Sequence, residues 1–263
     1  MELAGYLLAI LVGFTMGLIG GGGSILTVPI LVYLFGMDTL LASSYSLFVV
    51  GSTSAIGVLS HYRQGNIRFK NALFFGLPSI IGVFVTRKYL VTLIPSVIFS
   101  AGDFVMTKSI LLLILFALLM ITASYYMIRK SDAKDINLNT GIHKETLVLL
   151  GFIIGSLTGL LGAGGGFMIV PVLIYCSYTM KQAVGTSLFI MALSAFIGFL
   201  GDVYLGVKID YFFLLKFSGI AAIGILIGTS LSNYITPTKL KPAFGVFILI
   251  SGLYILIKET LFY

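Results

Sequence analysis

The sequence predicts an all-α integral membrane protein made of two homologous repeats that are inverted relative to each other. Three observations support this fold class. Hydrophobic residues make up 59% of the 263-residue chain and charged residues only 10%, whereas soluble domains carry about 25% charge. A glycine-rich motif begins at Gly13 and again at Gly155. The lysines and arginines stand singly or in small groups between apolar runs, which is typical of a chain that crosses a membrane several times.

The composition also limits the classes of function. A chain this apolar needs lipid as its solvent, so we expect a multi-pass protein of the cell membrane. A spanning helix needs roughly 20 apolar residues, which leaves room for about seven or eight crossings. We attribute the net charge of +7 to membrane topology rather than to nucleic-acid binding. The single cysteine, Cys176, makes neither an internal disulfide nor a metal site, and we expect no cofactor.

The repeat is clearest around two glycine runs. Residues 13–33 read GFTMGLIGGGGSILTVPILVY and residues 155–175 read GSLTGLLGAGGGFMIVPVLIY; placed in register, they match at 10 of 21 positions. Shared apolar composition explains the matching leucines, but it does not explain five glycines and a proline at the same spacing. The similarity continues from ASSYSLFVV at 42–50 to AVGTSLFIM at 183–191.

This duplication predicts the organisation of the chain. Residues 1–128 form the first transmembrane repeat, residues 129–145 a polar cytoplasmic linker, and residues 146–263 the second transmembrane repeat. In each repeat we expect a glycine-containing first segment followed by about three membrane-spanning helices. Residues 87–108 have no clear counterpart in the second repeat, and the sequence leaves their topology open.

The glycine runs are predicted to break the first helix of each repeat. One glycine costs a helix roughly 1 kcal/mol relative to alanine, and four stand in a row at 20–23. The second break is expected at 162–166. Pro29 and Pro171 weaken the helical pieces that follow. Broken backbone at membrane depth persists only where protein buries it or where it lines a wet cavity. The alternative is that these glycines only allow close helix packing.

Two topologies follow from the breaks. If residues 3–36 and 146–176 are re-entrant hairpins, each repeat keeps three full spans and the repeats are inverted. If both segments are discontinuous helices that span the membrane, the repeats are parallel. The distribution of lysines and arginines slightly favours the re-entrant topology, with the linker in the cytoplasm and both ends of the chain outside.

The breaks also suggest where a ligand binds. The N-terminal end of a half-helix presents free N–H groups and partial positive charge, which suits an anion, and nearby hydroxyls donate hydrogen bonds without adding charge. Each hydroxyl has an alternative role in bonding its own helix or a neighbouring one. The predicted substrate-binding residues are Gly20, Gly21, Gly22, Gly23, Ser24, Thr27, Ser46, Gly162, Gly164, Gly165, Gly166, Thr186 and Ser187, with Pro29 and Pro171 as structural helix breakers and no catalytic or metal-binding residue.

Few ionisable residues fall near the apolar runs. Arg87 and Lys88 end one of them and are expected to extend to the membrane interface. His61 aligns with Asp202, and we expect both to anchor loops, the alternative being a functional group inside the membrane.

The motifs GLIGGGGSILTVP and GLLGAGGGFMIVP, each followed by a hydroxyl-containing apolar segment with SLF, resemble the TauE/SafE sulfite exporter family, also called the toluene sulfonate uptake permease family. The resemblance covers nearly the whole chain. It implies transport of small sulfur-containing anions such as sulfite or organosulfonates, with binding near the bilayer centre between the repeats. The family motif falls on 20–24 with Pro29 and on 162–166 with Pro171. Ser24 stands where the second repeat has Gly166, so the two sides of a site need not be chemically equivalent.

The expected mechanism is alternating access, in which the two repeats rock about a central site that holds the anion. The alternatives are an anion channel of similar fold, a transporter of another small organic anion, a membrane enzyme and a non-transporting scaffold. The expected partners are a small anion and the lipid bilayer, without nucleic acid. The substrate, the direction of transport, the coupling ion and the presence of a homo-oligomer stay open.

Overall fold

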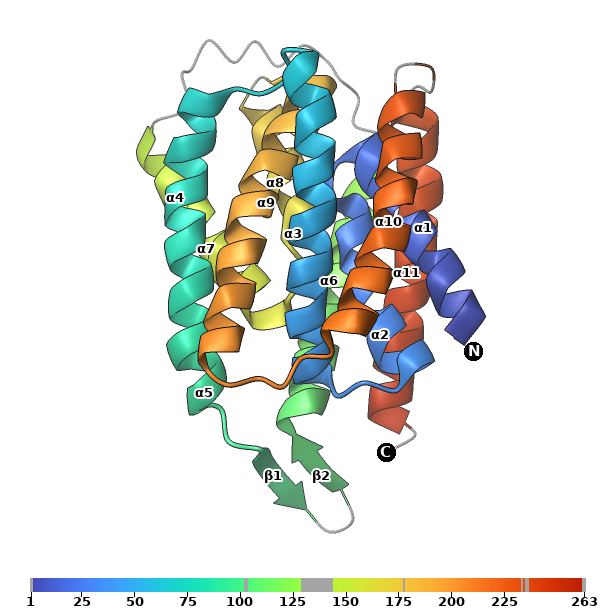
Figure 1. The fold of residues 1–263 in the computed structure, drawn as a ribbon. Coiled ribbons are helices and arrows are strands. Elements are labelled where there is room, and N and C mark those ends of the chain that lie inside the picture. Colours follow the sequence, from blue (N-terminus) through green and yellow to red (C-terminus); the bar gives the residue numbers. More distant parts are fainter. Residues whose placement is uncertain are drawn as a thin grey trace.

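The computed structural model describes residues 2–101, 104–128, 144–176, 178–232, 234 and 237–261. They form a bundle of helices with a small two-stranded hairpin at one end (Figure 1). Six described helices are long and apolar enough to cross a membrane, by length and composition: Glu2–Ile19, Thr39–Arg63, Ala72–Leu93, Lys108–Tyr125, Met180–Tyr204 and Tyr211–Leu231. The prediction of a helical, multi-pass membrane protein is thereby confirmed.

The elements follow one another with short connections where the structure describes them. In the first half of the chain they are α1 (Glu2–Ile19), the 3-10 helix η1 (Gly21–Leu26), α2 (Thr27–Phe35), α3 (Thr39–Arg63), α4 (Phe69–Val85), the π-helical turn η2 (Thr86–Leu90), α5 (Val91–Leu93), β1 (Val97–Ala101), β2 (Phe104–Thr107) and α6 (Lys108–Ile128). In the second half they are α7 (Lys144–Leu161), α8 (Gly166–Tyr175), α9 (Met180–Tyr204), α10 (Tyr211–Leu231) and α11 (Pro237–Leu261).

Both glycine runs interrupt a helix, as the sequence predicts. Helix α1 ends at Ile19, and Gly20 adopts a φ of +81° before the 3-10 helix begins. Helix α7 ends at Leu161, and the chain then passes through three glycines in the left-handed region before α8 begins. Glycine accepts this conformation without the steric cost that a Cβ atom brings. These three are Gly162, Gly164 and Gly165, with φ of +72°, +68° and +70°.

The segment α1–η1–α2 folds back on itself. The ring of Phe35, at the end of α2, packs edge-on against Tyr6, near the start of α1, with 5.4 Å between the ring centroids. A methyl group added to Gly5 would overlap the same Phe35 ring. The outer ends of α1 and α2 therefore lie together. In Figure 1, α7 and α8 make a similar bend, whose outer ends lie toward the opposite end of the bundle.

The two halves pack against each other in a pattern that occurs twice. Helix α1 lies along α10, and α7 lies along α4, while α3 packs on α9 and α6 on α11. The correspondence reaches individual residues. A methyl group on Gly82 of α4 would overlap the Phe152 carbonyl oxygen of α7, and one on Gly224 of α10 would overlap the Ile10 carbonyl oxygen of α1. Exchanging the halves therefore reproduces the same helix contacts.

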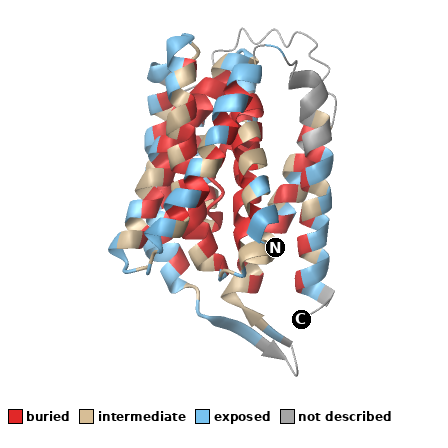
Figure 2. Ribbon diagram, turned by 45° about the vertical axis from the view of Figure 1, so that its right-hand side comes forward, coloured by how far each residue is buried: buried red, intermediate tan, exposed pale blue. Residues whose placement is uncertain are grey.

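The polarity of the surface is that of a protein surrounded by lipid. Buried residues gather along the inside of the bundle, and exposed residues cover its outer faces (Figure 2). Many of the exposed residues are large and apolar, and examples from three helices are Leu77, Ile81, Leu215, Ile223 and Ile250. In water such a surface would cause aggregation, but in a bilayer it faces hydrocarbon. Lipid is therefore the solvent for these faces.

The segment 87–108, which the sequence leaves unassigned, contains irregular structure. The π-helical turn η2 leads through α5 into the antiparallel hairpin of β1 and β2. The hairpin lies at the same end of the bundle as the loop that joins α9 to α10 (Figure 1). The predicted linker, except for its last two residues, lies outside the described residues.

We expect Gly82→Val to destabilise the contact between α4 and α7. Added side-chain atoms at this position meet the backbone of Phe152 and Ser156, and overpacking of this kind costs about 1–3 kcal/mol. Gly219→Val in α10 is the matched control, because nothing lies within 4 Å of the added Cβ atom. Thermal unfolding in detergent should give a lower Tm for the first variant alone. Equal Tm values for both variants would contradict the close approach of the two helices.

Candidate functional site

The two glycine breaks meet in the interior of the bundle. Gly21 in η1 and Gly166 at the start of α8 approach so closely that a methyl group on either would overlap the Cα atom of the other. Both glycines are buried, as is every residue from 20 to 31. Only glycine permits such an approach of two backbones. The structure thus brings the two predicted breaks together, although they are far apart in the sequence.

Each break also faces the long helix of the other half. Gly20 lies against Val184 and Ser187 of α9, and Gly162 lies against Ser43 of α3. The sulfur atom of Met191, on α9, lies close to both Gly21 and Gly166. The walls around the breaks are therefore formed by both halves of the chain, and a relative motion of the halves would change them.

The hydroxyls near the breaks fall into two groups. The Ser24 hydroxyl donates to the Gly21 carbonyl oxygen at 2.6 Å, and the Ser187 hydroxyl donates to that of Val184 at 2.8 Å. The hydroxyls of Thr27 and Ser46 are fully buried and have no hydrogen-bond partner in the described part of the chain. Burying an unpaired hydroxyl costs free energy, so these two are the better candidates for contact with a ligand.

Thr186, the other predicted hydroxyl, serves a different contact in this structure. Its oxygen accepts a hydrogen bond from the backbone N–H of Arg68 at 3.2 Å, which fixes the loop after α3 to the start of α9. Pro29 lies in the first turn of α2 and Pro171 within α8, and neither interrupts its helix, so the breaks come from the glycines alone.

A buried ion pair, which the sequence does not reveal, lies next to the second break. Arg87 in η2 is 3% exposed, and its Nη1 atom lies 3.1 Å from Oδ2 of Asp202 on α9. Its Nη2 atom donates a hydrogen bond to Ser43, the residue that contacts Gly162. The expectation that Arg87 reaches the membrane interface is therefore wrong, as is a loop-anchoring role for Asp202. Ionisable groups buried within a membrane protein are paired and are functional candidates.

The π-helical turn accounts for the position of Arg87. The extra residue of a π-turn shifts the register of the helix, and such turns are frequent at functional sites. Here Thr86 and Arg87 are both buried, whereas the next residue, Lys88, is exposed. The Nζ atom of Lys88 lies 5.6 Å from the ring centroid of Phe84 and 5.4 Å from that of Tyr89. Two adjacent basic residues thus occupy different environments, one inside the bundle and one at its surface.

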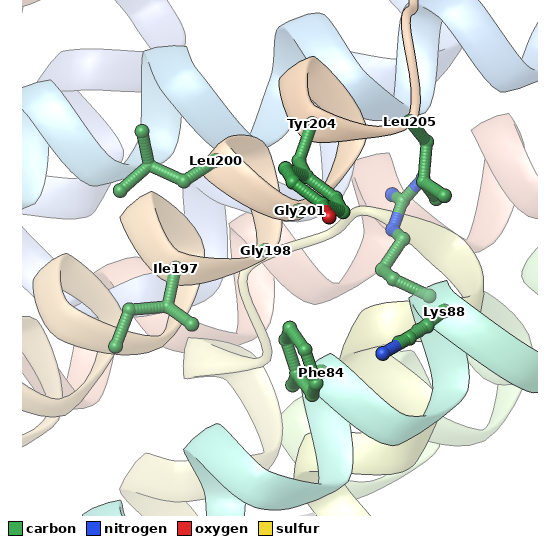
Figure 3. Close-up of a pocket in the computed structure, with 9 residues that line it drawn as sticks. Phe84, Lys88, Ile197, Gly198, Leu200, Gly201, Tyr204 and Leu205 are labelled. Carbon is green, nitrogen blue, oxygen red and sulfur yellow. The ribbon is translucent and has the colours of Figure 1, made fainter.

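A pocket of about 200 Å³ lies beside this pair, between α4 with η2 and the end of α9. Figure 3 shows Phe84 and Lys88 on one side of it and Leu200 and Tyr204 on the other. Arg87 also lines the pocket. By contrast, the small hollow beside Thr158 and Ala163, at the second break, has no room for a water molecule. Residues 20–31 and 161–167, which include both breaks, are buried in this conformation.

Among the residues that the structure describes, no three His, Cys, Asp or Glu side chains come together in a way that could hold a metal ion.

Comparisons with known proteins agree with this architecture. A family model described as "Sulfite exporter TauE/SafE" matches residues 6–255. A probable membrane transporter protein of Bacillus subtilis, YdhB, is 29% identical over 251 residues, which cover 95% of this chain and 98% of the relative. A probable membrane transporter protein of Xylella fastidiosa is 28% identical over 255 residues, covering 94% and 91%. MJ0441 of Methanocaldococcus jannaschii, also named a probable membrane transporter protein, is 30% identical over 199 residues, covering 72% and 68%.

No solved structure matches the chain. The family description and the names of the relatives indicate a membrane transporter, and the six apolar helices are consistent with a multi-pass protein of the cell membrane.

The two groups of hydroxyls should respond differently to substitution. Ser24→Ala removes a hydrogen bond and should cost about 0.6–1 kcal/mol of stability. Thr27→Val and Ser46→Ala remove hydroxyls that lack a partner, so we expect Tm in detergent to stay the same or rise. A fall in Tm for these two variants as large as that for Ser24→Ala would show that both hydroxyls already hold a structural partner.

Proposed function

The chain belongs to the TauE/SafE sulfite exporter family, and from this premise we propose that it is a secondary transporter of small sulfur-containing anions such as sulfite or organosulfonates. The family description and the names of the relatives support membrane transport as the activity. The choice of a sulfur-containing anion follows the family description.

We propose that residues 1–128 and 146–263 are inverted repeats. Gly151 and Gly155 of α7 contact Phe75 and Ser79 of α4 in the same order, so these two helices run parallel. Gly13 and Gly17 of α1 likewise contact Ala221 and Ile225 of α10 in order.

Because α4 and α10 run in opposite directions in Figure 1, α1 and α7 do so as well. Opposite directions of the two broken helices are what inverted repeats require.

The proposed binding site lies where the breaks meet, and the contact between Gly21 and Gly166 is the observation that carries the proposal. An anion loses its hydration on entering a membrane protein, so the site must replace water with fixed donors. We propose that the backbone N–H groups at the starts of η1 and α8 are these donors, together with the hydroxyls of Thr27 and Ser46, which are buried without a partner in the described part of the chain. They stabilise negative charge without burying a full positive one.

Transport would proceed by alternating access. The breaks are buried in this conformation, and their walls come from both halves of the chain. Rocking one half against the other along the contacts of α3 with α9 would therefore open the site toward one end of the bundle at a time. A channel of similar fold would instead need a continuous water-filled path.

The loop between α3 and α4 defines the proposed cytoplasmic side. It is flanked by Arg63, Arg68 and Lys70, and Lys181 lies in the first turn of α9, whose start packs against this loop. Clusters of basic residues mark the cytoplasmic ends of membrane helices. The loop between α9 and α10, at the other end of the bundle, would then face outward.

Cysteine labelling tests this orientation. In a Cys176→Ser background, we expect Lys208→Cys, in the loop after α9, to react in intact cells with a thiol reagent that cannot cross the membrane. Gln64→Cys, in the loop after α3, should react only after the cells are permeabilised. Both positions are exposed. Labelling of both from the same side would contradict inverted repeats.

Substitutions at the breaks test the site. Gly22→Leu or Gly165→Leu should abolish flux of labelled sulfite into proteoliposomes while leaving membrane insertion intact. At Gly165 the side chain would both strain a φ of +70° and overlap the Thr158 hydroxyl. Gly219→Leu, at an open position in α10, is the control and should transport normally. If either break variant carried sulfite at the wild-type rate, the result would contradict a binding site at the glycine runs.

A further inference from the structure

The buried Arg87 has more hydrogen-bonding capacity than its two partners use. A guanidinium carries five N–H donors. Nη1 is paired with Asp202 and Nη2 donates to Ser43, but Nε is buried without a partner in the described part of the chain. An arginine pairs most strongly with an oxyanion through two parallel N–H···O bonds. The present pair, in which one 3.1 Å contact joins the two side chains, leaves room for a better ligand.

The pocket gives that ligand a way in. Arg87 forms part of its wall, and Lys88, which is exposed, stands at the same wall. A volume of about 200 Å³ corresponds to about six or seven water molecules at roughly 30 Å³ each. It is large enough for a small oxyanion that still carries part of its hydration. Most of the remaining wall is apolar, with Phe84 and Leu200 among the lining residues, so the cationic groups are the parts that would hold an anion.

The position of Arg87 connects the pocket to the glycine breaks. Arg87 lines the pocket, and its guanidinium also bonds to Ser43. Ser43 in turn lies against Gly162, the first residue of the second break. An anion on Arg87 would therefore be one side chain away from the site proposed for transport.

This arrangement occurs on one side of the molecule. Gly82 and Gly224 make equivalent contacts in the two halves, and five residues beyond them stand Arg87 and Thr229. The residue that aligns with Asp202 is His61. The Thr229 hydroxyl donates to the backbone of its own helix, at Ile225 and Leu226. The corresponding place between α10 and α3 therefore lacks both the guanidinium and the carboxylate.

We propose that Arg87 is a binding site for a small oxyanion, reached through the pocket between α4 and α9, and that Asp202 is a tethered carboxylate that occupies the guanidinium while the anion is absent. This inference rests on the proposed function and deepens it, because it places the anion's first contact on its way to the glycine breaks. Binding requires Asp202 to release Arg87, so the carboxylate competes with the incoming anion.

Binding of methanesulfonate to the purified protein in detergent tests the competition. This monoanion keeps its charge across the working pH range, so the titration reports on the protein. The half-saturating concentration is measured from the ligand-induced rise in Tm. In Asp202→Asn we expect it to fall about tenfold, because a competitor that occupies the site nine-tenths of the time has been removed. In Arg87→Gln the shift should be lost.

Two variants keep the test decisive if a single substitution fails to fold. Arg87→Lys keeps the charge pair with Asp202 but lacks the planar fork, so binding should weaken about tenfold in a folded protein. Arg87→Gln with Asp202→Asn replaces both charges together, which avoids leaving one of them buried alone, and should fold without binding. His61→Asn, at the related position, is the matched control and should bind like the wild type.

The outcomes separate this inference from the proposed function. Unchanged binding in both Arg87→Lys and Asp202→Asn would overturn the inference, whatever the flux. A second combination is that the variants bind methanesulfonate as expected while the wild-type protein carries neither sulfite nor methanesulfonate into proteoliposomes. That combination would support the binding site at Arg87 and contradict the proposed transport. Equal loss of binding in His61→Asn and Arg87→Lys would show a general effect on folding and would also overturn the inference.

Discussion

The need to bury broken backbone within the membrane determines the rest of this structure. In hydrocarbon, an N–H or C=O group without a partner costs several kcal/mol, so a helix that stops at membrane depth must be enclosed by protein. The chain meets this need by placing its two breaks against each other at Gly21 and Gly166. The long helices α3 and α9 enclose them from both sides, and the pairs α1–α10 and α4–α7 pack outside. The breaks thus depend on contacts between the halves.

The fold was predictable to the extent that it depends on local chemistry. Glycine runs, prolines and apolar lengths predict the two helix breaks and the membrane spans, because each depends on the cost of a residue in its own segment. The strands β1 and β2 were missed, since a hairpin of this size gives a weak signal beside long apolar runs. The meeting of the two breaks depends on tertiary packing, although the duplication placed both of them in corresponding positions.

The ion pair shows why part of the candidate site could not be predicted. Arg87 follows an apolar run, a position from which most arginines reach the interface. Two facts make it different, the π-helical turn that buries it and a partner in the other half of the chain, Asp202. Neither is visible in local sequence. The alignment of Asp202 with His61 gave the one usable signal, because it marked the same place in both halves as polar.

The two halves make nearly equivalent helix contacts, but they carry different side chains at several corresponding positions. Ser24 stands where the second half has Gly166. The pair of Arg87 and Asp202, which joins the two halves, corresponds to Thr229 and His61, which also come one from each half. In the proposed alternating-access cycle, equivalent helix contacts would let the two halves exchange conformations at similar free energy. Unequal side chains would then give the two ends different affinities for the proposed anion. On this proposal the shared contacts provide the motion, and the differences at these few residues set how each side holds the anion.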